Sequence, residues 1–280
     1  MRIRIYPSRD AERMRFSTDI SLDPTLGCGQ AHRWRRSDDG KWSGVIGDAE
    51  VVLEQTEDGF ECRGDVSRRA VEEYFRMGDD LPAIMDSISR RDPNVASLAD
   101  ACPGLRILKQ PEWECLATYI LATNVNVKRI AKMVEQVCNI AGRDLGNRHA
   151  FPTPKEVLDA RSRICECRLG FREARFIRLC EDAEAGTVDV GMMRGMDYTE
   201  LTETLRGIYG VGPKVADCVA LFGFGHLCAF PVDVRISKVM LARYGIGGSY
   251  DRISSYGREL FGEYAGYAQE LLYHSGEIEG

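Results

Sequence analysis

The chain has 280 residues, 44% of them hydrophobic and 29% charged, so it is long enough to bury one large core or two modest ones. Its apolar runs are too short to cross a bilayer and its first residues lack the apolar stretch of a secretion signal, so we expect no membrane partner and a location inside the cell. The net charge of −6 argues against a nucleic-acid partner unless the basic residues, of which only seven of 37 are lysines, gather on one face.

Ten cysteines are scattered along the chain, a pattern typical of reduced and mostly buried thiols. Only Cys165 and Cys167 form a close pair, and no histidine lies at ligand spacing from them. With four histidines in total, we expect no metal site.

Up to about residue 65 the sequence predicts short strands. Aromatic and β-branched runs are broken by DDGK, GDAE and EDG, which are hairpin signals. Apolar residues three and four apart then predict helices over 67–77 and 81–89. The Cys-Pro-Gly break at 102–104 suggests a boundary between a β-rich domain ending in helices, residues 1–103, and a second domain, residues 104–280.

The second domain has helical periodicity almost throughout. Pro111 at a first-turn position, Gly142 at a helix end and the Thr153–Glu156 capping pair mark helix ends. The expected helices cover 111–123, 126–142, 153–161, 171–186, 198–207, 213–225, 233–245 and 255–274. The fold class is therefore α+β, with a small antiparallel sheet followed by an all-α domain.

The stretch GIYGVGPKVADCV, residues 207–219, admits three interpretations. A phosphate-binding P-loop fails because Pro213 precedes Lys214 and no Ser or Thr follows it. A dinucleotide fingerprint fails because Val215 stands where the third glycine belongs. A helix, a tight glycine hairpin and a second helix remain. The hairpin amides could hold a nucleic-acid phosphate, or the glycines could simply turn the chain.

Lys214 falls in the first turn of the second helix, at the positive end of the helix dipole. That position, with partial burial, would favour the neutral and nucleophilic amine; the alternative is a solvated lysine that touches phosphate. Asp233 follows an extended Pro-Val pair and is expected to cap a helix. A carboxylate close to Lys214 in space would favour the catalytic interpretation.

LRGIYGVGPKVADCV followed by PVDVRI resembles the helix-hairpin-helix DNA glycosylases. In particular, GQAHRWRR with WSGV, RILKQPEWECLATYILATNVNVKRIAKMVEQVC, RLGFREARFI and YAGYAQELLY resemble the 8-oxoguanine DNA glycosylase/lyase family over about Gly27 to Tyr273. Many relatives carry a four-cysteine iron–sulfur loop near the C-terminus, whereas no cysteine follows Cys228.

The resemblance implies catalytic roles for two residues and a base pocket. Lys214 would attack C1′ of a flipped nucleotide and form a Schiff base, and Asp233 would stabilise positive charge on the sugar. The base pocket would be formed by Gly29, whose carbonyl would accept from N7–H of 8-oxoguanine, by Gln269 at the Watson–Crick edge, and by Cys218 and Tyr273 on the two base faces.

The resemblance also implies contacts with the rest of the DNA. The residues expected at the gap and the opposite cytosine are Asn124, Arg129 and Arg172, with Phe171 as a wedge in the duplex. The residues expected at backbone phosphate are Gly210, Val211, Gly212 and Arg235. The chain departs from the family pattern at His32, Val125, Tyr209 and Arg235. Tyr209 affects the rigidity of the turn, and the other three affect opposite-base preference rather than the reaction.

The sequence therefore predicts a base-excision-repair DNA glycosylase with lyase activity, which acts on duplex DNA containing 8-oxoguanine, preferably opposite cytosine. Such an enzyme would work in the cytoplasm or nucleoid of a prokaryote, or the nucleus of a eukaryote. We expect a monomer with no cofactor, apart from a monovalent cation at the carbonyls of residues 207–212. The alternatives are a glycosylase for another damaged purine, which Lys214 disfavours, and a non-catalytic DNA-binding protein, which Lys214 and Asp233 together disfavour.

Overall fold

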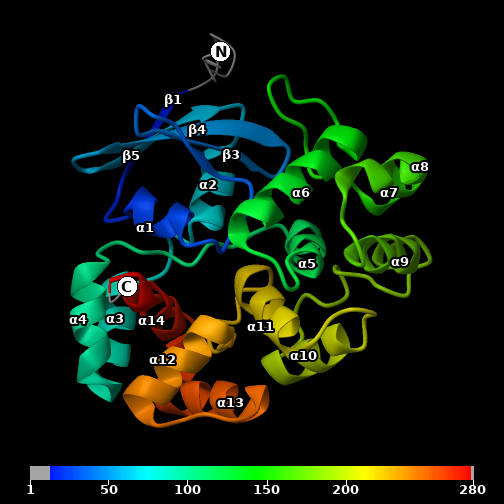
Figure 1. Ribbon diagram of the computed structural model, residues 1–280. Helices are drawn as coiled ribbons and strands as arrows, with labels where there is room; N and C mark the ends of the chain where they lie inside the picture. The colour runs from blue at the N-terminus through cyan, green and yellow to red at the C-terminus, as the bar shows by residue number, and fades with distance from the viewer. Residues whose placement is uncertain (1–12, 279–280) are drawn as a thin grey trace.

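The computed structural model describes residues 13–278, and its N-terminal part is a five-stranded antiparallel sheet (Figure 1). The strands run in the order β1-β5-β4-β3-β2. They are β1 Arg13–Ser17, β2 Arg35–Arg36, β3 Trp42–Ile46, β4 Ala49–Thr56 and β5 Gly59–Gly64. The predicted hairpin turns are confirmed, because each of the three breaks lies between two paired strands.

Helices make up the remainder of the described chain. They are α1 Leu22–Gly27, α2 Arg68–Tyr74, α3 Leu81–Arg91, α4 Pro93–Ala101, α5 Glu112–Leu121, α6 Val127–Ala141, α7 Pro154–Asp159, α8 Arg161–Ile164, α9 Arg172–Glu184, α10 Tyr198–Arg206, α11 Pro213–Phe222, α12 Val234–Tyr244, α13 Tyr250–Phe261 and α14 Ala265–Ile278, with short 3₁₀ turns η1 Cys165–Cys167 and η2 Gly262–Tyr264. A sheet followed by helices confirms the α+β class. Within residues 13–278, no helix has the length and apolar character of a membrane span.

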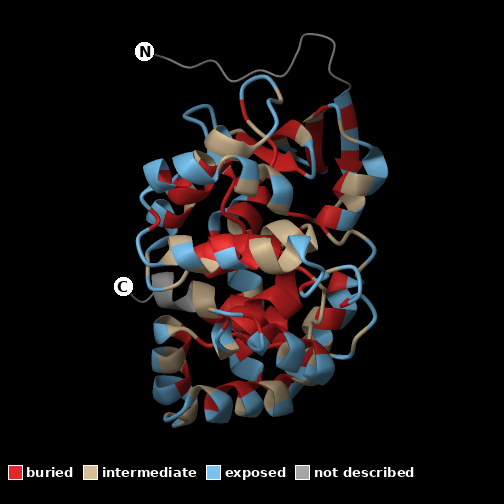
Figure 2. Ribbon diagram, turned by 90° about the vertical axis from the view of Figure 1, so that its right-hand side faces the viewer, coloured by how far each residue is buried: buried red, intermediate tan, exposed pale blue. Residues whose placement is uncertain are grey.

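Two hydrophobic cores hold the molecule together (Figure 2). The smaller core joins the sheet to α1 and α2, where Phe16 stacks on Phe60 across the β1–β5 pair with ring centroids 5.0 Å apart. The larger core joins the helices from α3 to α14. Helices α3 and α4 precede the predicted boundary at residues 103 and 104, yet their buried side chains pack into the larger core.

Local capping explains where several helices begin. Thr153 and Glu156 form both halves of the predicted capping box at α7. Pro111 lies one position before α5 rather than in its first turn, with φ −54° and ψ 131°. Gly142 ends α6 in an extended conformation (φ −82°, ψ 154°), so this glycine is not used for a left-handed cap.

The predicted helix-hairpin-helix is confirmed as α10, a turn over residues 207–212, and α11. Gly210 in the turn has φ +91°, a value that favours glycine, and Gly212 caps α11 with Pro213 as the first helical residue. Asp217 on α11 ties this helix to its neighbours: its buried carboxylate accepts hydrogen bonds from the hydroxyls of Tyr198 (2.6 Å), Tyr250 and Ser254 (3.1 Å). The start of α11 is thus held against α10 and α13.

Candidate active site

A cavity of about 680 Å³ lies where the loop after α1 meets the starts of α6, α11 and α12 and one face of α14. Seven of the residues that the sequence singled out line it. They are Gly29, Lys214, Cys218, Asp233, Arg235, Gln269 and Tyr273. These residues come from four separate parts of the chain, so the fold alone brings them together.

Lys214 lies in the first turn of α11, as predicted. The partial burial expected for it is wrong: its side chain is exposed at the mouth of the cavity. The reason is that the first turn of α11 opens onto the cavity, while burial begins with Val215 one residue later. The amine is therefore accessible to a large substrate approaching from solvent.

Asp233 caps α12, which confirms the predicted cap. One carboxylate oxygen accepts a hydrogen bond of 2.7 Å from the Ile236 amide, and the side chain is half-buried. This bond fixes the carboxylate at the start of α12, where it lines the same cavity as Lys214. The cavity therefore holds an accessible amine and an oriented carboxylate.

Cys218 lies one helical turn after Lys214 and is buried in the cavity wall. Burial raises the pKa of its thiol to about 12, although the positive charge of Lys214 acts in the opposite direction. A thiol in this state is a neutral contact surface. Tyr273 lies in the wall as well, and the Arg235 guanidinium stacks over its ring at 4.3 Å and donates to its carbonyl oxygen at 3.3 Å.

Gly29 is held in a conformation that suits only glycine. Its φ is +90°, and a Cβ atom added there would lie 3.2 Å from Cγ2 of Val127. The adjacent Gln30 side chain anchors this loop, since it donates to the Thr25 and Arg106 carbonyls and accepts from the Leu108 amide at 2.8–2.9 Å. The backbone at Gly29 therefore reaches the cavity from a fixed position.

Gln269 carries one of the polar groups that the cavity leaves unpaired. The residue is 5% exposed, and its Oε1 atom has no hydrogen-bond partner within residues 13–278. A buried amide oxygen without a partner costs about 1–3 kcal/mol. A ligand that donates a hydrogen bond at this point would remove that cost.

Three further residues of the cavity were not assigned roles from the sequence: Cys28, His32 and Glu270. His32 is buried and stacks edge-on against Tyr119, and burial, assisted by the charge of Lys214, lowers its pKa to about 4. Burial, with the charge of Asp233 adding to it, raises the pKa of Glu270 to about 7, against the opposing effect of a hydrogen bond with Cys28. Only their positions next to Gly29 and Gln269 in the sequence could have pointed to Cys28 and Glu270.

The residues predicted for the opposite strand form a separate group outside the cavity lining. Arg172 donates to the carbonyls of Thr123 (2.8 Å) and Asn124 (3.1 Å), and Arg129 donates to the Arg168 carbonyl at 3.1 Å. Phe171 is 52% exposed and has the Arg172 guanidinium over its ring at 4.4 Å. Burial lowers the pKa of Arg172, and the positive charges of Arg129 and Arg175 lower it further. Three cations therefore lie close together near an exposed aromatic ring.

The predicted phosphate-binding turn is accessible in part. Gly212 is exposed and Gly210 half-buried, whereas Val211 is buried and its amide donates to the Ile208 carbonyl at 3.0 Å. The turn itself therefore uses the Val211 amide. Gly212 is the residue of the three that is open to a phosphate.

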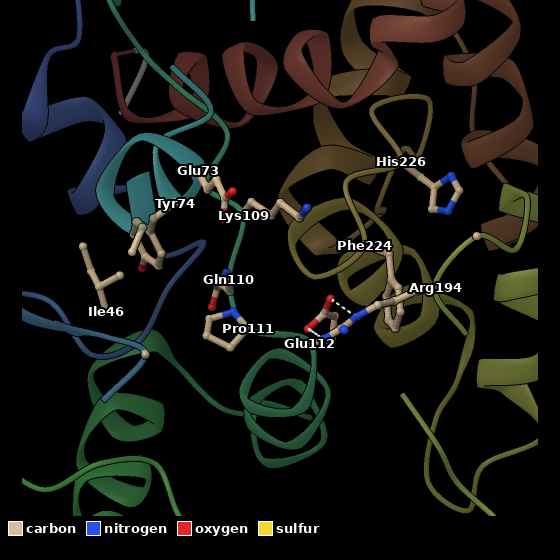
Figure 3. Close-up of a pocket in the computed structure, with 13 residues that line it drawn as sticks. Ile46, Glu73, Tyr74, Lys109, Gln110, Pro111, Glu112, Arg194, Phe224 and His226 are labelled. Carbon is tan, nitrogen blue, oxygen red and sulfur yellow. Dashed lines mark hydrogen bonds and ion pairs between the residues drawn. The ribbon is translucent and has the colours of Figure 1, made fainter. Parts of the chain in front are cut away.

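A second cavity of about 630 Å³ lies between the sheet and the α10–α11 region, and Figure 3 shows its lining. Lys109 extends into it, and Glu112 accepts two hydrogen bonds from Arg194 at 2.8 and 3.0 Å. Neither Lys214 nor Asp233 is among its lining residues. The candidate chemistry thus belongs to the first cavity.

Comparisons with known proteins indicate the family to which the chain belongs. A sequence profile of the 8-oxoguanine DNA glycosylase N-terminal domain matches residues 14–116. The chain is 29% identical to "N-glycosylase/DNA lyase OGG1" of Arabidopsis thaliana over 287 aligned residues, which cover 91% of this chain and 77% of the relative. It is 30% identical to "Probable N-glycosylase/DNA lyase" of Methanothermobacter thermautotrophicus over 68% of this chain and 69% of the relative.

Among solved structures, the 8-oxoguanine glycosylase/lyase of Clostridium acetobutylicum superimposes with a TM-score of 0.90 at 27% identity. The match covers 99% of this chain and 98% of that one. That structure holds double-stranded DNA containing cytosine opposite 8-oxoguanine.

Proposed function

Because the chain belongs to the helix-hairpin-helix family of 8-oxoguanine DNA glycosylase/lyases, we propose that it excises 8-oxoguanine from duplex DNA opposite cytosine and cuts the strand through Lys214. The observation that carries this proposal is the meeting of Lys214 and Asp233, from different helices, in one cavity with Gly29, Cys218 and Gln269. We propose that it acts in the compartment that holds the genome.

The chemistry begins at C1′ of a nucleotide turned out of the duplex. The Lys214 amine forms a bond to C1′ while the bond to the base breaks, and Asp233 stabilises the positive charge that develops on the sugar. Ring opening gives an imine between Nζ and C1′. Loss of a proton from C2′ then expels the 3′ phosphate oxygen, so the strand breaks and the imine is later hydrolysed.

Bound DNA would cover the Lys214 amine, which is open to water in the free protein. The amine is exposed in the DNA-free chain and lies at the positive end of α11. Duplex DNA that covers the mouth of the cavity excludes water from the amine and from the sugar. The covered site for nucleophilic attack is thus complete only where the substrate lies.

Recognition of the base uses the walls of the same cavity. N7 carries a hydrogen in 8-oxoguanine and a lone pair in guanine, so the carbonyl of Gly29 accepts from the lesion and repels guanine. The unpaired Oε1 of Gln269 accepts from the Watson–Crick edge, and Cys218 and Tyr273 lie on the two base faces. Arg235, which stacks on the Tyr273 ring, is close enough to this pocket to contact the neighbouring phosphate.

The rest of the duplex is held by two regions outside the cavity. Phe171 enters the gap left by the flipped nucleotide, while Asn124, Arg129 and Arg172 contact the orphaned cytosine. The turn with Gly210, Val211 and Gly212 binds a backbone phosphate, with Gly212 making the closest approach, and its carbonyls are the place for a monovalent cation. Amine and carboxylate supply the chemistry, so we propose that no other cofactor takes part.

A panel of matched duplexes tests the function. Single-turnover excision is measured on 8-oxoguanine opposite cytosine, 8-oxoguanine opposite adenine, a methylated purine and undamaged guanine. The proposal expects cleavage of the first duplex at least tenfold faster than of any other. Fastest release of the methylated purine would favour the other-lesion alternative, and binding with no release from any duplex would favour the non-catalytic one.

A further inference from the structure

Three side chains of metal-binding type meet beside the cavity that holds Lys214, and two of them line it. The Cys28 thiol, a Glu270 carboxylate oxygen and a His274 ring nitrogen all lie within 4.8 Å of one another. Cys28 follows α1, whereas the other two residues lie on α14. The cluster therefore could not be predicted from residue spacing in the sequence.

Ligand type and geometry suit a divalent transition metal. Zn²⁺ binds cysteine sulfur, histidine nitrogen and carboxylate oxygen in tetrahedral sites, in which ligand atoms lie about 3.5 Å apart. Glu270 and His274 are four residues apart and therefore on one face of α14. Because the three atoms lie within 4.8 Å of one another, bringing them to that separation requires a contraction of at most about 1.3 Å, which side-chain rotation and a small shift of the Cys28 loop can supply.

The Glu270 carboxylate supplies a second and independent reason for a cation here. The residue is 5% exposed, and its Oε2 atom has no hydrogen-bond partner among the described residues. A buried carboxylate oxygen without a partner is unfavourable, and a bound cation would compensate it.

Each of the three residues adjoins a residue of the proposed base pocket. Cys28 precedes Gly29, Glu270 follows Gln269, and His274 follows Tyr273. Cys28 and Glu270 also line the cavity. An ion bound by all three would draw the Gly29 loop and α14 together and narrow the space between the groups that hold the base.

We propose that Cys28, Glu270 and His274 bind a divalent transition-metal ion of the Zn²⁺ class, and that the bound ion inhibits base excision. The inhibition rests on the proposed function, whereas the metal site does not. The site is a regulatory one, since neither Lys214 nor Asp233 belongs to it.

Metal binding is tested on the full chain without DNA. Zn²⁺ is titrated against a chromophoric chelator for the wild type, Cys28→Ser, Glu270→Gln and His274→Gln, with Cys228→Ser and His226→Gln as matched controls outside the cluster. We expect one ion with a Kd of about 1 μM or tighter in the wild type and in both controls. Each cluster variant should bind at least about tenfold more weakly.

Co²⁺ bound to a thiolate absorbs light through a charge-transfer band. This band distinguishes loss of the Cys28 ligand from a general change in the fold. A thiolate-to-cobalt charge-transfer band should appear in the wild type and in Cys228→Ser, and should be absent in Cys28→Ser. Far-UV circular dichroism identifies any variant that fails to fold, and Glu270→Gln, which keeps the side-chain shape, then serves in its place. Wild-type binding weaker than about 100 μM, or equal binding by wild type and Cys28→Ser, would overturn the site.

Inhibition is tested by the ratio of excision rates with and without Zn²⁺ within each protein. Because a displacement of about 1 Å can cost two orders of magnitude in rate, we expect a fall of tenfold or more in the wild type, reversed by chelator, and a ratio near one in Cys28→Ser. Binding of Zn²⁺ with an unchanged wild-type ratio would overturn the inhibition. A protein that binds Zn²⁺ but excises 8-oxoguanine under neither condition would overturn the proposed function and leave the metal site standing.

Discussion

At the scale of single residues, Asp233 has two roles that substitution can separate. Its carboxylate caps α12 through the Ile236 amide, and it lines the cavity beside Lys214. Asparagine caps helices about as well as aspartate, so Asp233→Asn removes the charge and keeps the cap.

We expect Asp233→Asn to reduce the single-turnover excision rate on the order of 100-fold, since it removes the charge that stabilises the developing cation, while affinity for lesion DNA changes only a few-fold. Rapid-quench cleavage and a binding titration on the same duplex measure the two effects. The control is Asp217→Asn, which should instead reduce stability, because the buried Asp217 carboxylate accepts hydrogen bonds from three hydroxyl groups. An unchanged excision rate in Asp233→Asn would remove this carboxylate from the mechanism.

His32 is a second residue whose environment makes a quantitative prediction. Its folded pKa of about 4 lies below the value of 6.5 for an exposed histidine. The unfolded chain therefore binds the additional proton first as the pH falls, and stability is lost below about pH 6.5. Between pH 7.5 and pH 5 this group alone should cost about 2 kcal/mol of unfolding free energy.

Over that pH range we expect the unfolding free energy of His32→Phe to fall by about 2 kcal/mol less than that of the wild type. Both ring nitrogens of His32 are buried and have no hydrogen-bond partner among the residues that the structure describes, so phenylalanine should also be tolerated at pH 7.5. Urea unfolding at the two pH values measures the difference. Parallel pH profiles for the two proteins would show that His32 does not titrate in this way.

The sequence predicts the positions of some of these residues better than others. Local motifs place Lys214 and Asp233 at helix starts, whereas Gln269 was expected at the cavity only from the family resemblance. The burial of Glu270 is not predictable, since a glutamate on a C-terminal helix ordinarily faces solvent. The exposure of Lys214 depends on how α11 opens onto the cavity, a tertiary feature that local pattern does not contain.

At the scale of elements, the two glycines of the α10–α11 turn have different physical tasks. Gly210 has φ +91°, and an added Cβ would lie 2.7 Å from Cδ of Arg175. Gly212 has φ −96°, and an added Cβ would meet nothing within 4 Å. The fold therefore requires the first glycine and does not require the second.

We expect Gly212→Ala to leave the unfolding free energy within about 0.5 kcal/mol of the wild type and to weaken DNA binding several-fold, because the methyl group occupies the space of the phosphate. The slope of log affinity against log salt should fall by about 0.9 if one phosphate contact is lost. Gly210→Ala is the matched variant and should destabilise the fold by about 1–2 kcal/mol. Unchanged DNA affinity in Gly212→Ala would contradict phosphate binding at this turn.

The hairpin turns and most helices could be predicted because their signals are local: turn residues, caps and apolar spacing. Helix α1 is six residues long and has no side-chain cap, so packing against the sheet determines it. Helix α4 was not predicted, although Asp92 caps it and Pro93 is its first residue; it packs against α14. The membership of α3 and α4 in the larger core also follows from packing, since a break such as Cys102–Pro103–Gly104 marks a turn and not which core a helix joins.

At the scale of the whole molecule, the acidic net charge of −6 and DNA binding are compatible because charge is distributed unevenly. Arg129, Arg172 and Arg175 gather around the exposed Phe171, and Lys214 and Lys238 lie at the cavity. The composition indicates that only a concentrated basic surface could bind DNA, and the structure places such a group of arginines beside Phe171, the residue proposed as the wedge.

The central claim is that Lys214 becomes covalently attached to the sugar of the excised nucleotide. Borohydride reduces an imine to a stable amine, so incubation of the protein with a duplex containing 8-oxoguanine opposite cytosine should give a protein–DNA adduct on a denaturing gel. The same incubation with Lys214→Gln should give none, while Lys238→Gln, which removes another lysine of the cavity, should trap as the wild type does. A wild-type protein that cleaves the duplex without a trapped adduct, or a Lys214→Gln protein that still forms one, would contradict the account.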